Sequence, residues 1–142
     1  MQIQSKYFGT IEINPETIIE MVQPIYGFET SKRYTLISDE EIGTDLVWFQ
    51  SVDDKEVCFI LANPQRFVSD VNIELVMDDL NIVQAKALED VDVLSIVSLG
   101  ETFEKSTLNL KSPIILNSKN NHGAQLILNQ DLPFKASMGE IC

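Results

Sequence analysis

The sequence predicts an all-β fold: a single antiparallel, barrel-like domain that spans residues 1–142 and carries one short helical insertion. Three observations predict this fold. β-Branched and aromatic residues come in runs of about four to eight separated by turn residues, which is the pattern of short strands. Only one stretch has helical spacing. Closing the sheet into a barrel removes the exposed strand edges that such a chain would otherwise carry.

Turn residues separate the expected strands. Gly9 divides the first two, and the acidic turn Asp53-Asp54-Lys55 joins two later strands as a hairpin. The segment from Pro15 to Val22 is predicted to be loop or strand, because its β-branched residues disfavour a helix and Pro24 follows closely. The expected strands cover residues 2–8, 10–13, 33–38, 46–51, 57–62, 71–76, 91–99, 106–110, 113–117 and 124–128.

The helical insertion is expected around Asp78 to Asp90. The pair Asp78-Asp79 favours a helix N-terminus, where carboxylates accept hydrogen bonds from free backbone N–H groups. Apolar residues then recur at helical spacing, namely Leu80, Val83, Ala87 and Val91. The stretch is short, so we expect one or two turns of helix.

The charge of the chain limits its partners. Twenty-two acidic residues against ten basic residues give a net charge of −12, which opposes direct contact with nucleic-acid phosphates or anionic membranes. The excess is concentrated between Asp39 and Glu104, where sixteen acidic residues face three basic ones. A basic protein partner is favoured, although an acidic surface also serves solubility alone.

The ends and the cysteines of the chain indicate a cytoplasmic protein. No apolar run reaches the roughly 18 residues that cross a bilayer, and the first residues lack the apolar core of a secretory signal. Cys58 lies in an apolar run and Cys142 is the last residue. We therefore expect no disulfide between them.

The inventory of reactive residues is poor. The single histidine, His122, lies in a turn sequence rich in Asn and Gly, and the two cysteines are far apart, so no zinc-ligand spacing exists. Neither a P-loop nor another glycine-rich phosphate loop is present. We expect no cofactor, no metal and no catalytic residue. Carboxylate pairs are common, however, so a small β-barrel enzyme or ligand carrier that uses surface carboxylates stays open as an alternative.

Candidate partner-binding residues follow from strand geometry. Trp48 and Phe49 point to opposite faces of one strand, so one faces the core and the other is available as an interface anchor. Asn63 and Pro64 end the next strand, because proline cannot donate to a sheet. Phe67 then either folds back on the core or projects, and we expect it to project. Two further candidates, expected to attract a basic partner, are Asp78 and Asp79.

Several segments together resemble the flagellar assembly factor FliW family over essentially the whole chain. They are Tyr7-Phe8-Gly9 with Ile11-Glu12-Ile13, Ile25-Tyr26-Gly27-Phe28-Glu29, Trp48-Phe49-Gln50-Ser51-Val52-Asp53-Asp54, Asn63-Pro64, Asn109-Leu110-Lys111-Ser112-Pro113-Ile114-Ile115-Leu116-Asn117 and Gly123-Ala124-Gln125-Leu126-Ile127-Leu128. No single segment is specific to the family, but the order and spacing of the segments are.

The resemblance implies a non-enzymatic protein with two partners. One is newly made flagellin, bound in the cytoplasm, and the other is the RNA-binding translational repressor CsrA, which the family antagonises. Secretion of flagellin then frees the factor to sequester CsrA, so that flagellin synthesis follows export. We expect the free protein to be a monomer, with self-association through an apolar patch as the alternative.

Overall fold

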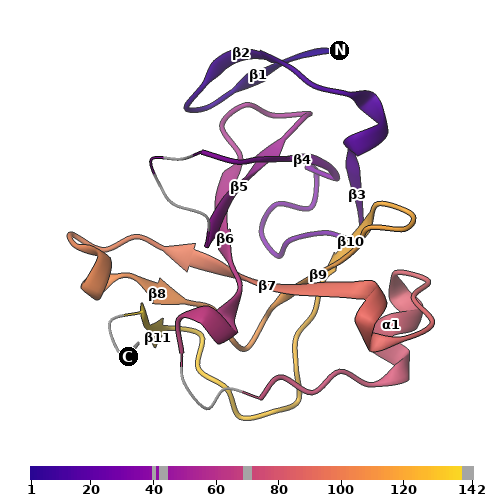
Figure 1. The fold of residues 1–142 in the computed structure, drawn as a ribbon, viewed down its shortest axis with the longest axis vertical. Coiled ribbons are helices and arrows are strands. Elements are labelled where there is room, and N and C mark those ends of the chain that lie inside the picture. Colours follow the sequence, from indigo (N-terminus) through magenta and orange to yellow (C-terminus); the bar gives the residue numbers. More distant parts are fainter. Residues whose placement is uncertain (40, 42–44, 69–71, 139–142) are drawn as a thin grey trace.

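The computed structural model describes residues 1–39, 41, 45–68 and 72–138. Seven strands of its main sheet form a closed ring (Figure 1). In ring order they are β7 (Val91–Ser98), β6 (Cys58–Ala62), β5 (Leu46–Ser51), β4 (Arg33–Ile37), β3 (Ile19–Gln23), β10 (His122–Gln125) and β9 (Ile114–Asn117), and β9 pairs with β7 to close the ring. The predicted all-β barrel is confirmed. One correction concerns strand direction, because β3 and β10 pair in parallel while the other pairs in the ring are antiparallel.

The remaining strands lie outside the ring. β1 (Gln2–Ser5) and β2 (Gly9–Glu12) form a separate hairpin, whose turn Gly9 closes with a positive φ of 67°. β8 (Thr107–Leu108) pairs with the second half of β7, and β11 (Ala136–Ser137) pairs with β8. Figure 1 shows the hairpin at one extreme of the molecule and β8 with β11 towards the other.

Short helical segments punctuate the strands. The predicted insertion contains α1 (Met77–Ile82) and a 3₁₀ turn, Leu88–Asp90. Asp79 caps the start of α1 as expected, because its Oδ2 accepts a hydrogen bond of 2.9 Å from the Val76 N–H. Further 3₁₀ turns are Pro15–Thr17, Pro64–Arg66 and Phe103–Lys105. The open segment from Pro15 to Val22 thus contains a turn followed by the start of β3.

The strand expected over residues 71–76 is wrong for its described part, residues 72–76. This segment pairs with no other described strand, and a side chain satisfies part of its backbone. Gln130 Oε1 accepts a hydrogen bond of 2.8 Å from the Glu74 N–H, and Gln130 Nε2 donates one of 2.7 Å to the Asn72 carbonyl. Ile73 and Leu75 still pack inward against a hydrophobic cluster. The alternation was therefore a true sign of burial but not of strand pairing.

The turn before β10 also differs in detail from its prediction. Asn121 supplies the positive φ, at 57°, whereas Gly123 does not adopt one. Gly123 lies inside the barrel, where a Cβ would come within 2.8 Å of both Leu116 Cδ2 and Met21 Sδ. Glycine leaves room there for interior side chains, and it does not serve the turn.

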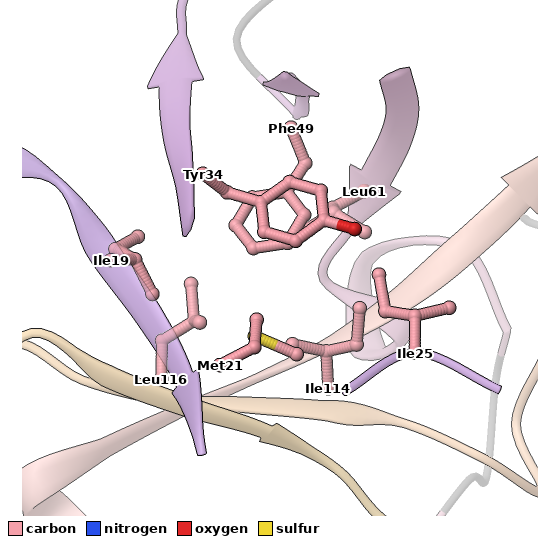
Figure 2. Packing of buried hydrophobic residues seen from close by; sticks show 8 residues of the cluster. All are labelled: Ile19, Met21, Ile25, Tyr34, Phe49, Leu61, Ile114 and Leu116. Carbon is pink, nitrogen blue, oxygen red and sulfur yellow. The ribbon is translucent and has the colours of Figure 1, made fainter. Parts of the chain in front are cut away.

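Three hydrophobic clusters hold the fold together. The barrel interior contains Tyr34 stacked on Phe49, with ring centroids 4.3 Å apart (Figure 2). A second cluster includes Phe67, Leu108 and Met138. The third lies between the helical insertion and the strands β7, β9 and β10. Asn117 Nδ2 secures that insertion by donating a 2.9 Å hydrogen bond to the Val83 carbonyl.

The two ends of the barrel differ. At one end, residues 24–32 connect β3 to β4, and Ile25 inserts into the interior cluster with 2% of its surface exposed (Figure 2). We call this the closed end. At the other end lie the starts of β3, β5, β7 and β10 and the ends of β4, β6 and β9. We call this end the mouth.

Candidate protein-binding site

The turn that follows β6 lies at the mouth. Asn63 Oδ1 accepts a hydrogen bond of 3.1 Å from the Gln65 N–H, and Pro64 occupies the first position of the 3₁₀ turn, where its fixed φ fits. The Phe67 N–H then donates to the Pro64 carbonyl at 3.1 Å. These bonds fix a tight turn that exposes Asn63, Gln65 and Arg66 and buries the Pro64 ring.

Phe67 does not project from this turn. The prediction that it projects is therefore wrong. Only 6% of its surface is exposed, and it packs in the second cluster with Ile60 and Ala62 of β6. The chain reverses after Pro64, which returns the next aromatic to the outer face of the strand it has just left. Phe67 is a core residue that supports the turn, and it offers no surface to a partner.

A groove runs beside the turn, at the seam where β6 departs from β7. The two strands pair from Ile60 to Ala62, and beyond Ala62 the chain turns away from the first residues of β7. Two hollows of about 260 Å³ and 250 Å³ fill the gap and share Asn63. The first is lined by Asn63, Pro64, Gln65, Ile73, Leu88, Val91, Asp92 and Val93, and the second by Asp45, Leu46, Val47, Leu61, Asn63, Arg66 and Leu94.

The groove combines apolar surface with acidic groups. Leu88, on the 3₁₀ turn after α1, is 56% exposed although it is a large apolar residue. Asp92 lines one hollow and Asp45 the other, with Arg66 as the one cation among the lining residues of these two hollows. An exposed leucine within a concave surface of mixed character is typical of a protein interface.

The two aromatic candidates on β5 have separate roles. Phe49 is fully buried in the barrel interior, so it is a core residue. Trp48 lies on the outer face, half-buried against the second cluster and beneath the N-terminal hairpin. The rings of Tyr7 and Phe8 pack on it, with centroid distances of 4.8 Å and 5.7 Å. Trp48 therefore anchors the hairpin, and neither residue lines the groove.

The acidic candidates on α1 also lie apart from the groove. Asp79 is occupied in capping the helix, whereas Asp78 is exposed. Neither residue lines the two hollows. Nearer to the mouth, Asp90 Oδ1 binds Lys119 Nζ at 2.8 Å. This contact lowers the pKa of Asp90 and raises that of Lys119. Of the predicted site residues, the structure brings only Asn63 and Pro64 to the groove.

Catalytic chemistry finds little support in the described residues. Burial raises the pKa of the Cys58 thiol to about 11, so it stays protonated and is a poor nucleophile at neutral pH. The part of the chain that the structure describes holds no cluster of three potential metal ligands. Within the same residues, no helix is long and apolar enough to cross a membrane.

Sequence reasoning missed two residues of the groove, Leu88 and Asp92. Leu88 belongs to the predicted helical insertion but not to its apolar stripe, and that mismatch was the available signal. Asp92 alternates with Val91 and Val93 and so resembles an ordinary solvent-facing strand residue. Only the pairing of β7 with β9 shows which face it occupies.

Comparison with known proteins identifies the family. The sequence profile described as FliW protein matches residues 2–138, nearly the whole chain. The chain belongs to the FliW protein family. A flagellar assembly factor FliW from Exiguobacterium sp. is 41% identical, with 98% of this chain and 95% of that protein covered. The flagellar assembly factor FliW of Thermoanaerobacter pseudethanolicus is 37% identical, with 92% of this chain and 87% of that protein covered.

The fold agrees with a solved structure of the family. The crystal structure described as that of the flagellar assembly factor FliW superposes with a TM-score of 0.89 at 30% identity, covering 97% of this chain and 96% of that one. The barrel, the hairpin and the groove therefore belong to a FliW family member. Flagellar assembly is not in itself an enzymatic role, so the site is best treated as a surface for protein partners.

Proposed function

We propose that this chain is a non-enzymatic flagellar assembly factor that binds flagellin in the cytoplasm and antagonises the translational repressor CsrA. Release of flagellin by export would free the chain to sequester CsrA, which couples flagellin synthesis to export. The observation that carries the proposal is the groove at the mouth of a FliW family barrel, where exposed Leu88 lies beside the rigid Asn63–Arg66 turn.

Physical chemistry supports a protein partner at this groove. Leu88 is 56% exposed, so burying the rest of its side chain contributes about 1–1.5 kcal/mol, which is about tenfold in affinity. The turn beside it is held by its own hydrogen bonds, so little ordering of the backbone is required on binding. An RNA-binding repressor is basic, and a chain with a net charge of −12 attracts it over long range.

The test compares two leucines of similar exposure. Leu88→Glu alters the groove, and Leu99→Glu is the matched control, since Leu99 is 66% exposed and follows β7 at the closed end. Binding of purified flagellin and of purified CsrA is measured by calorimetry for both variants. We expect Leu88→Glu to weaken at least one partner by about tenfold or more, because the charge must be desolvated. Equal binding by wild type and both variants would show that the groove does not bind these partners.

Salt dependence tests the electrostatic part of the proposal. Charges on the surface are screened over about 10 Å at 0.1 M salt, so the association rate with CsrA should fall as salt rises while the dissociation rate changes less. Asp78→Asn is the appropriate variant, because Asp79 also caps α1 and its loss would disturb the helix. An association rate independent of salt concentration would mean that the acidic surface serves solubility alone.

A further inference from the structure

The mouth of the barrel contains a further hollow of about 410 Å³, which shares Asp92 with the first hollow of the groove. Its inner wall is apolar: Ile19 and Leu116 belong to the interior cluster, and Leu36 lies opposite the interior residue Phe49 on β5. Leu36 is nevertheless 42% exposed. Leu36 thus extends the apolar interior to the surface at this end, as far as the described residues show.

One carboxylate points into this hollow from the wall. Asp92 on β7 pairs with Leu116 on β9, and its neighbour Leu94 pairs with Ile114. Residues paired across an antiparallel ladder share a face, and Leu116 and Ile114 both face the interior, so Asp92 does as well. Within the described residues, the Asp92 carboxylate has neither a hydrogen bond nor an ion pair.

The other described residues that line the hollow add negative charge and no lysine or arginine. Glu16 lines the hollow, and neither lysine nor arginine occurs among its lining residues. Lys119, which follows the lining residue Ser118 in the sequence, forms an ion pair with Asp90 at 2.8 Å. The other polar lining residues come from β4 and from the segments before β3 and around the β9–β10 turn, namely Thr17, Thr35, Asn117, Ser118, Asn121 and His122. The hollow therefore pairs apolar walls with unbalanced acidic charge.

We infer that the mouth is a socket for a lysine or arginine side chain of a basic protein partner. Such a side chain has an apolar stem that fits against Ile19, Leu36 and Leu116 and a cationic head that Asp92 and Glu16 attract. The acidic net charge of the chain favours a partner of the same chemistry. This inference rests on the proposed function, because it assigns an anchor point to the basic partner.

The first experiment tests the socket without any partner protein. n-Butylguanidinium, n-butylammonium and the neutral control n-butanol are titrated into isotope-labelled full-length chain, and backbone amide shifts are followed by NMR. The two cations should shift residues of the mouth on β3, β4 and β9, whereas n-butanol should have little effect. Asp92→Asn should weaken the cation response about fivefold or more. Glu20→Gln should not, since Glu20 alternates with Ile19 and Met21 on β3 and faces outward. Equal responses in the two variants would overturn the socket.

The second experiment uses CsrA as the partner and separates the two hypotheses. Asp92→Asn should weaken binding about tenfold, and Glu20→Gln, which removes the same charge, should change it less than twofold. Equal losses in both variants would mean that net charge alone matters and would overturn the inference. If wild type binds neither CsrA nor flagellin, the proposed function fails, and the response to the alkyl cations then decides whether the socket exists. Thermal unfolding of each variant checks that its fold is intact.

Discussion

The closed end and the mouth belong to the same barrel but have opposite designs. At the closed end, a long connection between β3 and β4 inserts Ile25 into the interior cluster and completes it. At the mouth, the interior cluster ends at Leu116, Leu36 is exposed, and Asp92, whose carboxylate binds no other described residue, shares their face. The closed end therefore contributes to stability, whereas the mouth leaves apolar surface exposed, and we propose that a partner covers it.

The largest expected difference between the two ends concerns stability. Ile25→Ala removes a buried side chain from a filled core and should lower the free energy of unfolding by about 2–5 kcal/mol. Leu36→Ala removes a side chain that already faces solvent, so its cost should be below about 1.5 kcal/mol. Urea unfolding of both variants measures the two values. Similar losses would show that the mouth is packed as tightly as the closed end.

The Asn63 turn should give a smaller effect. Asn63→Ala removes the acceptor for the Gln65 N–H and should cost about 1 kcal/mol, whereas Asn63→Asp retains an acceptor and should be nearly neutral. Gln65→Ala is the control, because only its backbone takes part in the turn. Thermal unfolding compares the three. If Asn63→Ala is as stable as wild type, the Pro64 ring and the backbone hydrogen bonds hold the turn without the Asn63 side chain.

The smallest effect concerns the ion pair beside the closed end. Arg33 donates to Asp53 Oδ1 at 2.6 Å, which holds the pKa of Asp53 below its ordinary value of 3.8. A depressed pKa adds stability above the ordinary value, and this stability is lost as the pH falls through the pKa of the folded state. Arg33→Gln should therefore raise the pKa of Asp53 in an NMR titration. The pair is exposed, so the loss of stability at neutral pH should stay below about 1 kcal/mol. An unchanged Asp53 pKa would contradict the assignment.

The contrast between the ends also explains which parts of the fold could be predicted from the sequence. Strand periodicity predicted the barrel and the helical insertion, because both depend on local patterns that burial enforces. It failed for residues 72–76, where Gln130, distant in the sequence, satisfies the backbone in place of a strand. The parallel pairing of β3 with β10 was equally invisible, since it joins segments about a hundred residues apart.

The site was predicted less well than the fold. Asn63 and Pro64 were found because proline has a local steric consequence. The direction of Phe67 depends on how the chain turns after Pro64, and burial of Phe49 depends on which strand face lies inside the ring. Asp92 was missed because its alternation with valines suggests a solvent face, whereas the pairing with β9 turns it inward. Residues at a mouth are defined by closure of the sheet, and closure is a tertiary property.

The central claim is that partners dock at the mouth end, and amide hydrogen exchange tests it most directly. Exchange is measured on the free chain and on its complexes with purified flagellin and with purified CsrA. We predict that at least one partner slows exchange in the Asn63–Arg66 turn and in residues 117–122, while residues 24–31 at the closed end exchange as in the free chain. Tyr26 in that closed-end loop is 81% exposed and offers an alternative aromatic anchor. Protection confined to residues 24–31 with both partners would contradict the account and move the interface to the closed end.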